Sequence, residues 1–401
     1  MSLSTGVTDL ATAVGAKIKS VDNSLLLVPN DAVATKPLYV YANSYGAIPR
    51  VWGIAERYPE RLASRLKSGL VVRGVGGAMA HDIAKYLYGS FTLPIQDAST
   101  PAGTWNVSPN NYGIFIPEVA RNDAGYDSFE STTKARAGYT NSLMAIIRLI
   151  RAQSQLQDTN GAFVYTGAGW THTATSPTLY RGGTHSSTLT PGDFVVITTP
   201  VGTDFDVVLY GDDPTNAGGF DGTPFTTVID GVAGPSGDSS QSFAGSKFKT
   251  GSSTAINPFV VGFHGMSNSV HTIKIVHAGA NDGKHLLTVT NLLTQSVNPP
   301  TILIPKIAKL TNDGYTTYGG DASWTTHQIY NGLIDSIVSQ FSSDKSIISA
   351  DPMAFGWDPA IHTWTNGIHP NDAGAKIYAD ACMAALNALE PRIGLSTIMT
   401  T

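Results

Sequence analysis

The chain has 401 residues, of which 42% are hydrophobic and 14% are charged. This length predicts two or three domains, and this composition suits folded domains with sizeable cores rather than a disordered chain. A net charge of −5 without a Lys/Arg run argues against a nucleic-acid partner and against an anionic membrane. No stretch approaches the roughly 18 consecutive apolar residues of a membrane span, and the single cysteine excludes an intramolecular disulfide.

The N-terminal segment, residues 1–30, is expected to form an amphipathic helix over residues 5–28 that serves in assembly or attachment. Its apolar residues recur at spacings of three and four: Val7, Leu10, Val14, Ile18, Val21 and Leu25. This stripe needs a cover, either further copies of the helix or the remainder of its own chain. A basic stretch followed by an apolar run is missing at the N-terminus, so no secretory signal peptide is expected.

From Pro37 onward, strands and helices alternate. Strands are expected at Leu38–Tyr41, Leu70–Val72, Tyr112–Val119, Thr301–Ile304 and Ser346–Ile348. Helices are expected at Val51–Lys67, His81–Tyr88, Lys134–Gln155, Ile329–Phe341 and Ala373–Leu389. Such alternation predicts an α/β fold, a three-layer arrangement in which helices cover both faces of a parallel sheet. This domain is discontinuous and comprises residues 37–160 and 298–391.

Residues 161–297 have a different pattern, of short β-rich runs separated by turn residues. The runs are Phe163–Tyr165, Phe194–Ile197, Phe205–Tyr210, Thr226–Ile229, Phe259–Phe263, Thr272–Val276 and Leu286–Val289. Many short strands with frequent turns predict a jelly-roll β-sandwich, here inserted into the α/β domain.

Four residues in loops near strand ends carry the candidate chemistry. Ser44, Gly77 and Asn122 each follow a predicted strand, and His369 precedes the last helix. In open parallel sheets, ligand sites lie beyond the carboxyl ends of the strands. A hydroxyl, a base and donors for an oxyanion are what covalent ester hydrolysis requires. Ser44 and His369 would supply the first two, and the Gly77 backbone N–H, the Ser44 backbone N–H and the Asn122 amide would form the oxyanion hole.

At these residues the sequence resembles the SGNH (GDSL-like) hydrolase family, whose name gives the order Ser, Gly, Asn, His. The four matching blocks are Tyr39–Ser44, Gly74–Ala78, Ala120–Asp123 and Asn366–Gly374. The resemblance implies a serine esterase that needs no cofactor and no metal. The scattered histidines likewise lack the spacing of a metal site.

The sequence departs from the family pattern at several positions. Ala42–Asn43 replaces the Gly-Asp before the serine, and the third block begins with Ala120 rather than Gly. The position of the triad acid holds Asn366. An Asn can orient an imidazole through its side-chain oxygen but cannot stabilise the imidazolium as a carboxylate does. Three consequences are possible: turnover is slow, another acid such as Asp358 serves, or the site only binds its ligand. His362 is an alternative to His369 as the base.

Two further resemblances concern the flanking parts. The insert resembles carbohydrate-binding jelly rolls, and five of its aromatic residues could stack on sugars or fill the core: Tyr165, Trp170, Tyr180, Phe220 and Phe225. The segment Val7–Lys19 resembles the opening helix of tail proteins from phages of actinobacteria. This second resemblance implies a virion protein that acts extracellularly at a host surface, assembles as a trimer and contacts other tail proteins.

The sequence therefore predicts an esterase or deacylase that acts on ester groups of a cell-envelope glycan or a lipid-linked glycan. Two alternatives remain. One is a catalytically weak tail protein that recognises host glycan as a receptor, and the other is a free intracellular esterase.

Overall fold

The computed structural model describes residues 36–47, 56–74, 76–88, 113–128, 131–174, 183–212, 222–239, 256–296, 298–343 and 346–389. The helix expected over residues 5–28 lies outside these ranges, as do Tyr180 and Phe220. Among the described helices, none combines the length and the apolar character that crossing a bilayer requires.

Five parallel strands form the central sheet in the order β17-β16-β3-β1-β2. Their bounds are β1 Leu38–Ala42, β2 Leu70–Gly74, β3 Ile114–Glu118, β16 Thr301–Pro305 and β17 Ile347–Ala350. All five residues of β3 are buried, as expected for the middle strand of a sheet covered on both faces. The chain order of the strands reverses direction at β1 and β3, and this reversal marks the usual ligand-binding edge of such sheets.

Helices cover both faces of this sheet. One face packs against α4 (Ala80–Tyr88), α6 (Thr132–Arg151) and α8 (Trp324–Ser339). The other packs against α3 (Tyr58–Leu66) and α10 (Asp372–Leu389). The remaining helices are short: α2 Ser44–Ala47, α5 Arg121–Ala124, α7 Asn312–Tyr318, the 3-10 turn η3 Pro352–Phe355 and α9 Pro359–His362.

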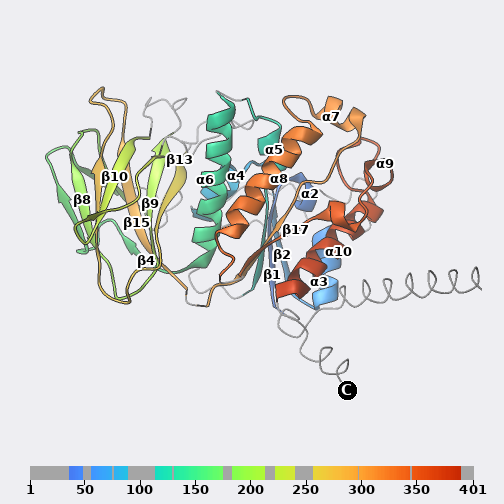
Figure 1. The fold of residues 1–401 in the computed structure, drawn as a ribbon, viewed down its shortest axis with the longest axis horizontal. Coiled ribbons are helices and arrows are strands. Elements are labelled where there is room, and N and C mark those ends of the chain that lie inside the picture. The colour runs from blue at the N-terminus through green and yellow to red at the C-terminus, as the bar shows by residue number, and fades with distance from the viewer. Residues whose placement is uncertain are drawn as a thin grey trace, which may run out of the picture.

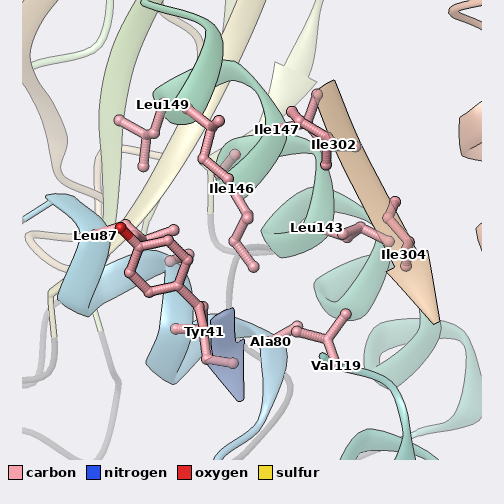
Figure 2. Close-up of a cluster of buried hydrophobic side chains, with 14 of the residues drawn as sticks. Tyr41, Ala80, Leu87, Val119, Leu143, Ile146, Ile147, Leu149, Ile302 and Ile304 are labelled. Atoms are coloured by element: carbon pink, nitrogen blue, oxygen red, sulfur yellow. The ribbon is translucent and has the colours of Figure 1, made fainter. Parts of the chain in front are cut away.

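The core on the α6 side shows how the sequence pattern produces this layering. Figure 2 shows Leu143 and Ile147 of α6 facing Ile302 and Ile304 of β16, with Tyr41 of β1 nearby. Four of these side chains have no exposed surface, and Tyr41 keeps only 6%. Burying a Leu or Ile side chain is worth about 1.5–3 kcal/mol, so this layer contributes strongly to holding α6 on the sheet.

The insert forms a β-sandwich of two antiparallel sheets. One contains β11-β10-β14-β8-β5, with β12 paired to β10, and the other contains β13-β9-β15-β7-β6, with β4 paired to β15. The bounds are β4 Ala152–Gln157, β5 Phe163–Thr166, β6 Thr171–Ala174, β7 Thr184–Thr188, β8 Phe194–Thr198, β9 Phe205–Asp212, β10 Pro224–Ile229, β11 Val232–Ala233, β12 Gly237–Asp238, β13 Ile256–Phe263, β14 Thr272–His277 and β15 Leu287–Gln295. Apolar residues from both sheets form one core between them. The predicted fold class is thus confirmed.

The sandwich packs directly on the α/β domain (Figure 1). Val208, Tyr210 and Leu293, from the sheet that contains β9 and β15, belong to the same hydrophobic cluster as α4 and α6. Tyr88 of α4 stacks edge-on against Tyr210 with ring centroids 5.5 Å apart, and its hydroxyl donates to Thr290 Oγ1 at 2.6 Å. The insert therefore shares a core with the domain that it interrupts.

Three helix boundaries differ from the sequence-based expectation by more than two residues. The helix expected to reach Gln155 ends at Arg151, because the next residues pair with β15 and become β4. The helix expected over Val51–Lys67 is described only from α3, whose first turn is closed by Glu60 accepting the Arg57 N–H at 2.8 Å. α8 begins at Trp324 rather than Ile329, because Ser323 caps it by accepting the Thr326 N–H.

Candidate active site

The register of the parallel strands brings three loops to one edge of the sheet. Ala42, the last residue of β1, is paired with Gly74 of β2 and with Glu118 of β3. The segments that carry Ser44, Gly77 and Asn122 therefore leave the sheet side by side. The loop between α9 and α10 adds His369 at the same edge, since its ring contacts Ser44.

Ser44 and His369 lie within hydrogen-bond distance, with Ser44 Oγ 3.0 Å from His369 Nε2. Both side chains are half-buried. Ser44 is the first residue of α2, and the turn at its start is fixed by the Asn43 side-chain oxygen Oδ1, which accepts the Tyr45 N–H at 3.0 Å. A hydroxyl and an imidazole at this distance are the pair that nucleophilic catalysis requires.

Asn366 contacts the other ring nitrogen of His369, but through its amide nitrogen. Its Nδ2 is 2.8 Å from His369 Nδ1, while its Oδ1 accepts the backbone N–H groups of Ile368 at 3.0 Å and His369 at 3.1 Å. Rotating the amide would turn its NH₂ group toward those two N–H donors, so the backbone fixes the orientation. The expectation that the side-chain oxygen orients the imidazole is therefore wrong.

This orientation determines the tautomer of His369. An NH₂ group donates, so Nδ1 must accept, and the proton of the neutral ring lies on Nε2. In that form His369 donates to Ser44 Oγ and cannot accept its proton. Burial, aided by the charge of Arg121, also lowers the pKa of His369 to about 3. The site as it stands disfavours the imidazolium that acyl transfer would form.

The rival acid and the rival base lie in a neighbouring turn. The Asp358 carboxylate caps α9 by accepting the Ala360 N–H at 2.9 Å. His362 Nδ1 accepts the Asp358 N–H at 2.8 Å, and the ring packs beside Trp357. Both residues stabilise α9, and the ring of His369 is the one that contacts Ser44.

The loops expected to form the oxyanion hole are tied together by buried polar groups. The Asn122 amide donates to the Ala78 carbonyl oxygen at 2.7 Å, and its second N–H remains to donate. The Asp123 carboxylate accepts the Ala80 and Ala120 N–H groups, at 3.1 Å for the nearer oxygen in each case. Gly77 has φ +81°, in the region that favours glycine.

Ala120 adopts a backbone conformation that suits glycine, with φ +85° and ψ −37°. It occupies the position where the resembled family has Gly. A Cβ at such a positive φ strains the backbone by about 1–3 kcal/mol. Ala120 thus replaces a glycine of the family pattern but keeps the backbone conformation that suits glycine.

Three residues that the sequence analysis missed support the site. The Tyr45 hydroxyl donates to the Ile368 carbonyl oxygen, and its ring lies 5.6 Å from that of His369. The Tyr318 hydroxyl donates to Asn122 Oδ1. This bond fixes the amide so that its oxygen faces Tyr318 and its nitrogen donates to the Ala78 carbonyl oxygen. The Glu118 carboxyl group accepts the N–H of Gly46 in α2. Tyr45 was detectable as the neighbour of Ser44, whereas Tyr318 lies in a segment without a recognisable motif.

Two buried ionisable side chains, Glu118 and Arg121, lie beneath α2. Glu118 accepts the Tyr58 hydroxyl at 3.0 Å and the Gly46 N–H, and burial raises the pKa of its carboxyl to about 8. The Arg121 guanidinium stacks over the Tyr45 ring at 3.8 Å. These two side chains support α2, which carries Ser44, and Arg121 places a positive charge near His369.

The sandwich has a group of partly exposed aromatic side chains, Tyr165, Trp170 and His172. The ring centroid of Tyr165 is 4.7 Å from that of Trp170 and 4.8 Å from that of His172. Phe225, by contrast, is 2% exposed and belongs to the sandwich core. Within the described part of the chain, no group of three or more His, Cys, Asp or Glu side chains could hold a metal ion.

No family model and no curated protein matches the chain. Among solved structures, a two-domain esterase (CEX) active on acetylated mannans aligns with 70% of this chain and 95% of its own, at 9% identity and a TM-score of 0.31. A family two carbohydrate esterase from Cellvibrio japonicus aligns over 38% of each chain, at 12% identity and a TM-score of 0.23. The carbohydrate-binding module CBM36, in complex with calcium and xylotriose, aligns with 36% of this chain and 99% of its own, at 14% identity and a TM-score of 0.23. Similarities this low assign no activity.

Proposed function

We propose that the chain is a serine ester hydrolase in which Ser44 is the nucleophile and His369 the general base. The observation that carries this proposal is the 3.0 Å separation of Ser44 Oγ and His369 Nε2 at the carboxyl edge of the parallel sheet. The buried Asn122 amide and the Gly77 backbone N–H stand in the neighbouring loops as the donors for an oxyanion.

In acylation, His369 Nε2 takes the Ser44 proton as Oγ attacks the ester carbonyl, and the same proton then goes to the leaving alcohol. Water repeats these steps on the acyl-enzyme and releases the acid. The tautomer imposed by Asn366 must first change, so turnover is slow. In a serine protease, replacing the triad Asp with Asn lowers turnover about 10⁴-fold, which sets the scale of the expected penalty.

For the substrate, we favour an O-acyl group carried by a cell-envelope glycan. Tyr165 and Trp170 pack against the sandwich core but keep part of their surface exposed, and His172 beside them is exposed. Exposed aromatic ring surface of this kind would suit contact with a sugar ring. A sandwich that shares a core with the α/β domain would keep a bound glycan at a fixed distance from Ser44.

A second candidate function is glycan recognition with little or no turnover. The observation that favours it is the amide of Asn366, which holds His369 in the form that cannot deprotonate Ser44. Whether either function is carried out in a phage tail or by a free intracellular esterase is a separate proposal. The case for a phage tail depends on the N-terminal sequence alone.

The test is hydrolysis of short-chain nitrophenyl esters and release of acid from purified bacterial envelope, wild type beside Ser44→Ala. Slow hydrolysis that the substitution abolishes supports the esterase. Equal rates for the two proteins refute it. Binding of envelope by both proteins, with no hydrolysis by either, favours the second candidate.

A further inference from the structure

The position of the triad acid holds an Asn-Gly pair, Asn366–Gly367. In such a pair the following residue has no side chain to shield the Asn side-chain carbon Cγ, so the glycine nitrogen can attack it and the amide is lost. The chain contains two other pairs of this kind, Asn160–Gly161 and Asn331–Gly332. Only the pair at Asn366 would place the resulting carboxylate beside a histidine that contacts a serine.

We propose that Asn366 is a site of spontaneous deamidation and that the Asp formed there completes a Ser44–His369–Asp triad. This inference rests on the proposed function, because it assigns a control of the same site. The freshly made protein would then be a weak esterase that becomes more active with age.

The reaction balances with water as the one co-reactant. The Gly367 nitrogen loses its proton to solvent and bonds to Asn366 Cγ. The Cγ–Nδ2 bond breaks, and Nδ2 leaves as ammonia after taking a proton from water, which leaves a five-membered succinimide. Water then adds to Cγ and reopens the ring, so that Asn plus water becomes Asp plus ammonia.

The contacts of the Asn366 side chain favour the first step. Attack on Cγ places negative charge on Oδ1, and Oδ1 already accepts the N–H groups of Ile368 and His369. Two backbone donors aimed at a developing oxyanion are the arrangement that stabilises such an intermediate. One contact opposes the step, because the Gly367 N–H donates to the Trp364 carbonyl oxygen at 2.8 Å and must be released first. We therefore expect slower conversion than in an open chain.

The loop also favours Asp over the isomer in which the backbone runs through the side chain. The Gly367 carbonyl oxygen accepts the Thr311 N–H at 3.2 Å, and Thr363 pairs with Pro370 across the loop. Opening the succinimide at the backbone carbonyl would insert an extra carbon between these fixed points. Opening it at Cγ restores the original path.

The new carboxylate would reverse the hydrogen bond to the imidazole. One oxygen would keep the Ile368 and His369 N–H groups, and the other would face Nδ1 and accept a proton from it. Nε2 would then be free to take the Ser44 proton. A negative charge at this point would also raise the pKa of His369 by offsetting its burial and the charge of Arg121.

The other two Asn-Gly pairs are internal controls. Asn331 lies within α8, and its amide is bound at both ends to the main chain of Ile307, at 2.8 Å and 2.9 Å, so it should stay intact. Asn160 lies in an exposed turn between β4 and β5 and should convert without effect on Ser44.

The experiment ages the full-length protein in mildly alkaline buffer at physiological temperature. Samples are assayed for nitrophenyl acetate hydrolysis and analysed by peptide mass spectrometry at all three Asn-Gly pairs. We expect the amide at Asn366 to be lost and activity to rise in step, by at least about tenfold and toward about 10⁴-fold, to the level of fresh Asn366→Asp. The activity of Asn366→Gln should not rise during ageing, because its longer side chain cyclises far more slowly. Ser44→Ala should deamidate at Asn366 without gaining activity.

Two outcomes overturn the inference while the esterase proposal stands. One is an intact Asn366 when Asn160 has converted, with Asn366→Asp active. The other is conversion to the isomer with flat activity, again with Asn366→Asp active. If fresh Asn366→Asp has no activity that depends on Ser44, the proposed function itself fails.

Discussion

Replacing Glu118 with Gln removes a buried ionisable group from directly beneath the helix that carries Ser44. Burial raises the pKa of the Glu118 carboxyl from 4.5 to about 8, while hydrogen bonds from Tyr58 and Gly46 oppose the rise. A Gln side chain keeps an oxygen that can accept both hydrogen bonds. The substitution should therefore cost little at a pH where Glu118 is already protonated.

The size of the effect follows from the pKa difference between the folded and the unfolded chain. Between pH 4.5 and about 8, the folded protein holds a proton that the unfolded chain has released. The folded state is therefore destabilised as pH rises, by about 1.4 kcal/mol per pH unit and by about 5 kcal/mol in all. The stability gained from the bound proton is fully present below pH 4.5, the pKa in the unfolded chain. It is lost as pH rises through about 8, the pKa in the folded protein.

The assay is urea unfolding of wild type and Glu118→Gln at several pH values from about 5 to about 9. Subtracting the two free energies cancels groups common to both proteins, such as Asp123, whose pKa burial raises to about 6. We expect the two proteins to be similar near pH 5 and the Gln variant to be several kcal/mol more stable near pH 9. A difference in the free energy of unfolding that does not change with pH would contradict a Glu118 that is protonated in the folded protein.

Three further predictions concern the proposed oxyanion donor Asn122, the positive φ of Ala120 and assembly through the N-terminal helix. Asn122→Ala should lower turnover by roughly 10²–10³, and Tyr318→Phe should lower it less, both in kcat rather than KM; an effect confined to KM would contradict the oxyanion role. Ala120→Gly should leave the free energy of unfolding unchanged or higher, because it relieves a positive φ, whereas Ala135→Gly within α6 should cost about 1 kcal/mol; equal losses would argue against strain. Light scattering should find three copies of the full chain and fewer for a chain that starts at Lys36, whereas monomers in both cases would exclude assembly through the N-terminal helix.

The sequence was sufficient for the parallel sheet and for the residues at its edge. β1, β3 and β16 are short apolar runs bounded by polar loops, so both their identity and the position of Ser44 behind β1 could be predicted. The pairing of Ser44 with His369 was inferred from the order of the blocks, and the structure places the two side chains 3.0 Å apart.

What could not be predicted depends on contacts that no local pattern contains. The amide of Asn366 points its nitrogen at His369 because two backbone N–H groups of the same loop occupy its oxygen. Tyr318 reaches Asn122 from a distant part of the sequence.

Three strands of the sandwich, β4, β6 and β7, could not be predicted from the sequence either. β6 and β7 are rich in Thr, Ser and His, so they lack the apolar alternation by which a strand is recognised. Residues 152–155 continue a helical pattern but pair with β15, because tertiary pairing outweighs local propensity.

The most direct test is the rate of nitrophenyl acetate hydrolysis by fresh Asn366→Asp, compared with fresh wild type and with the Asn366→Asp/Ser44→Ala double variant. We expect Asn366→Asp to be at least about tenfold faster than wild type, because a carboxylate accepts the Nδ1 proton and leaves Nε2 able to deprotonate Ser44. We expect the double variant to be inactive. A rate for Asn366→Asp no higher than wild type, or a double variant that remains active, would contradict the assignment of Ser44, His369 and Asn366 to one catalytic unit.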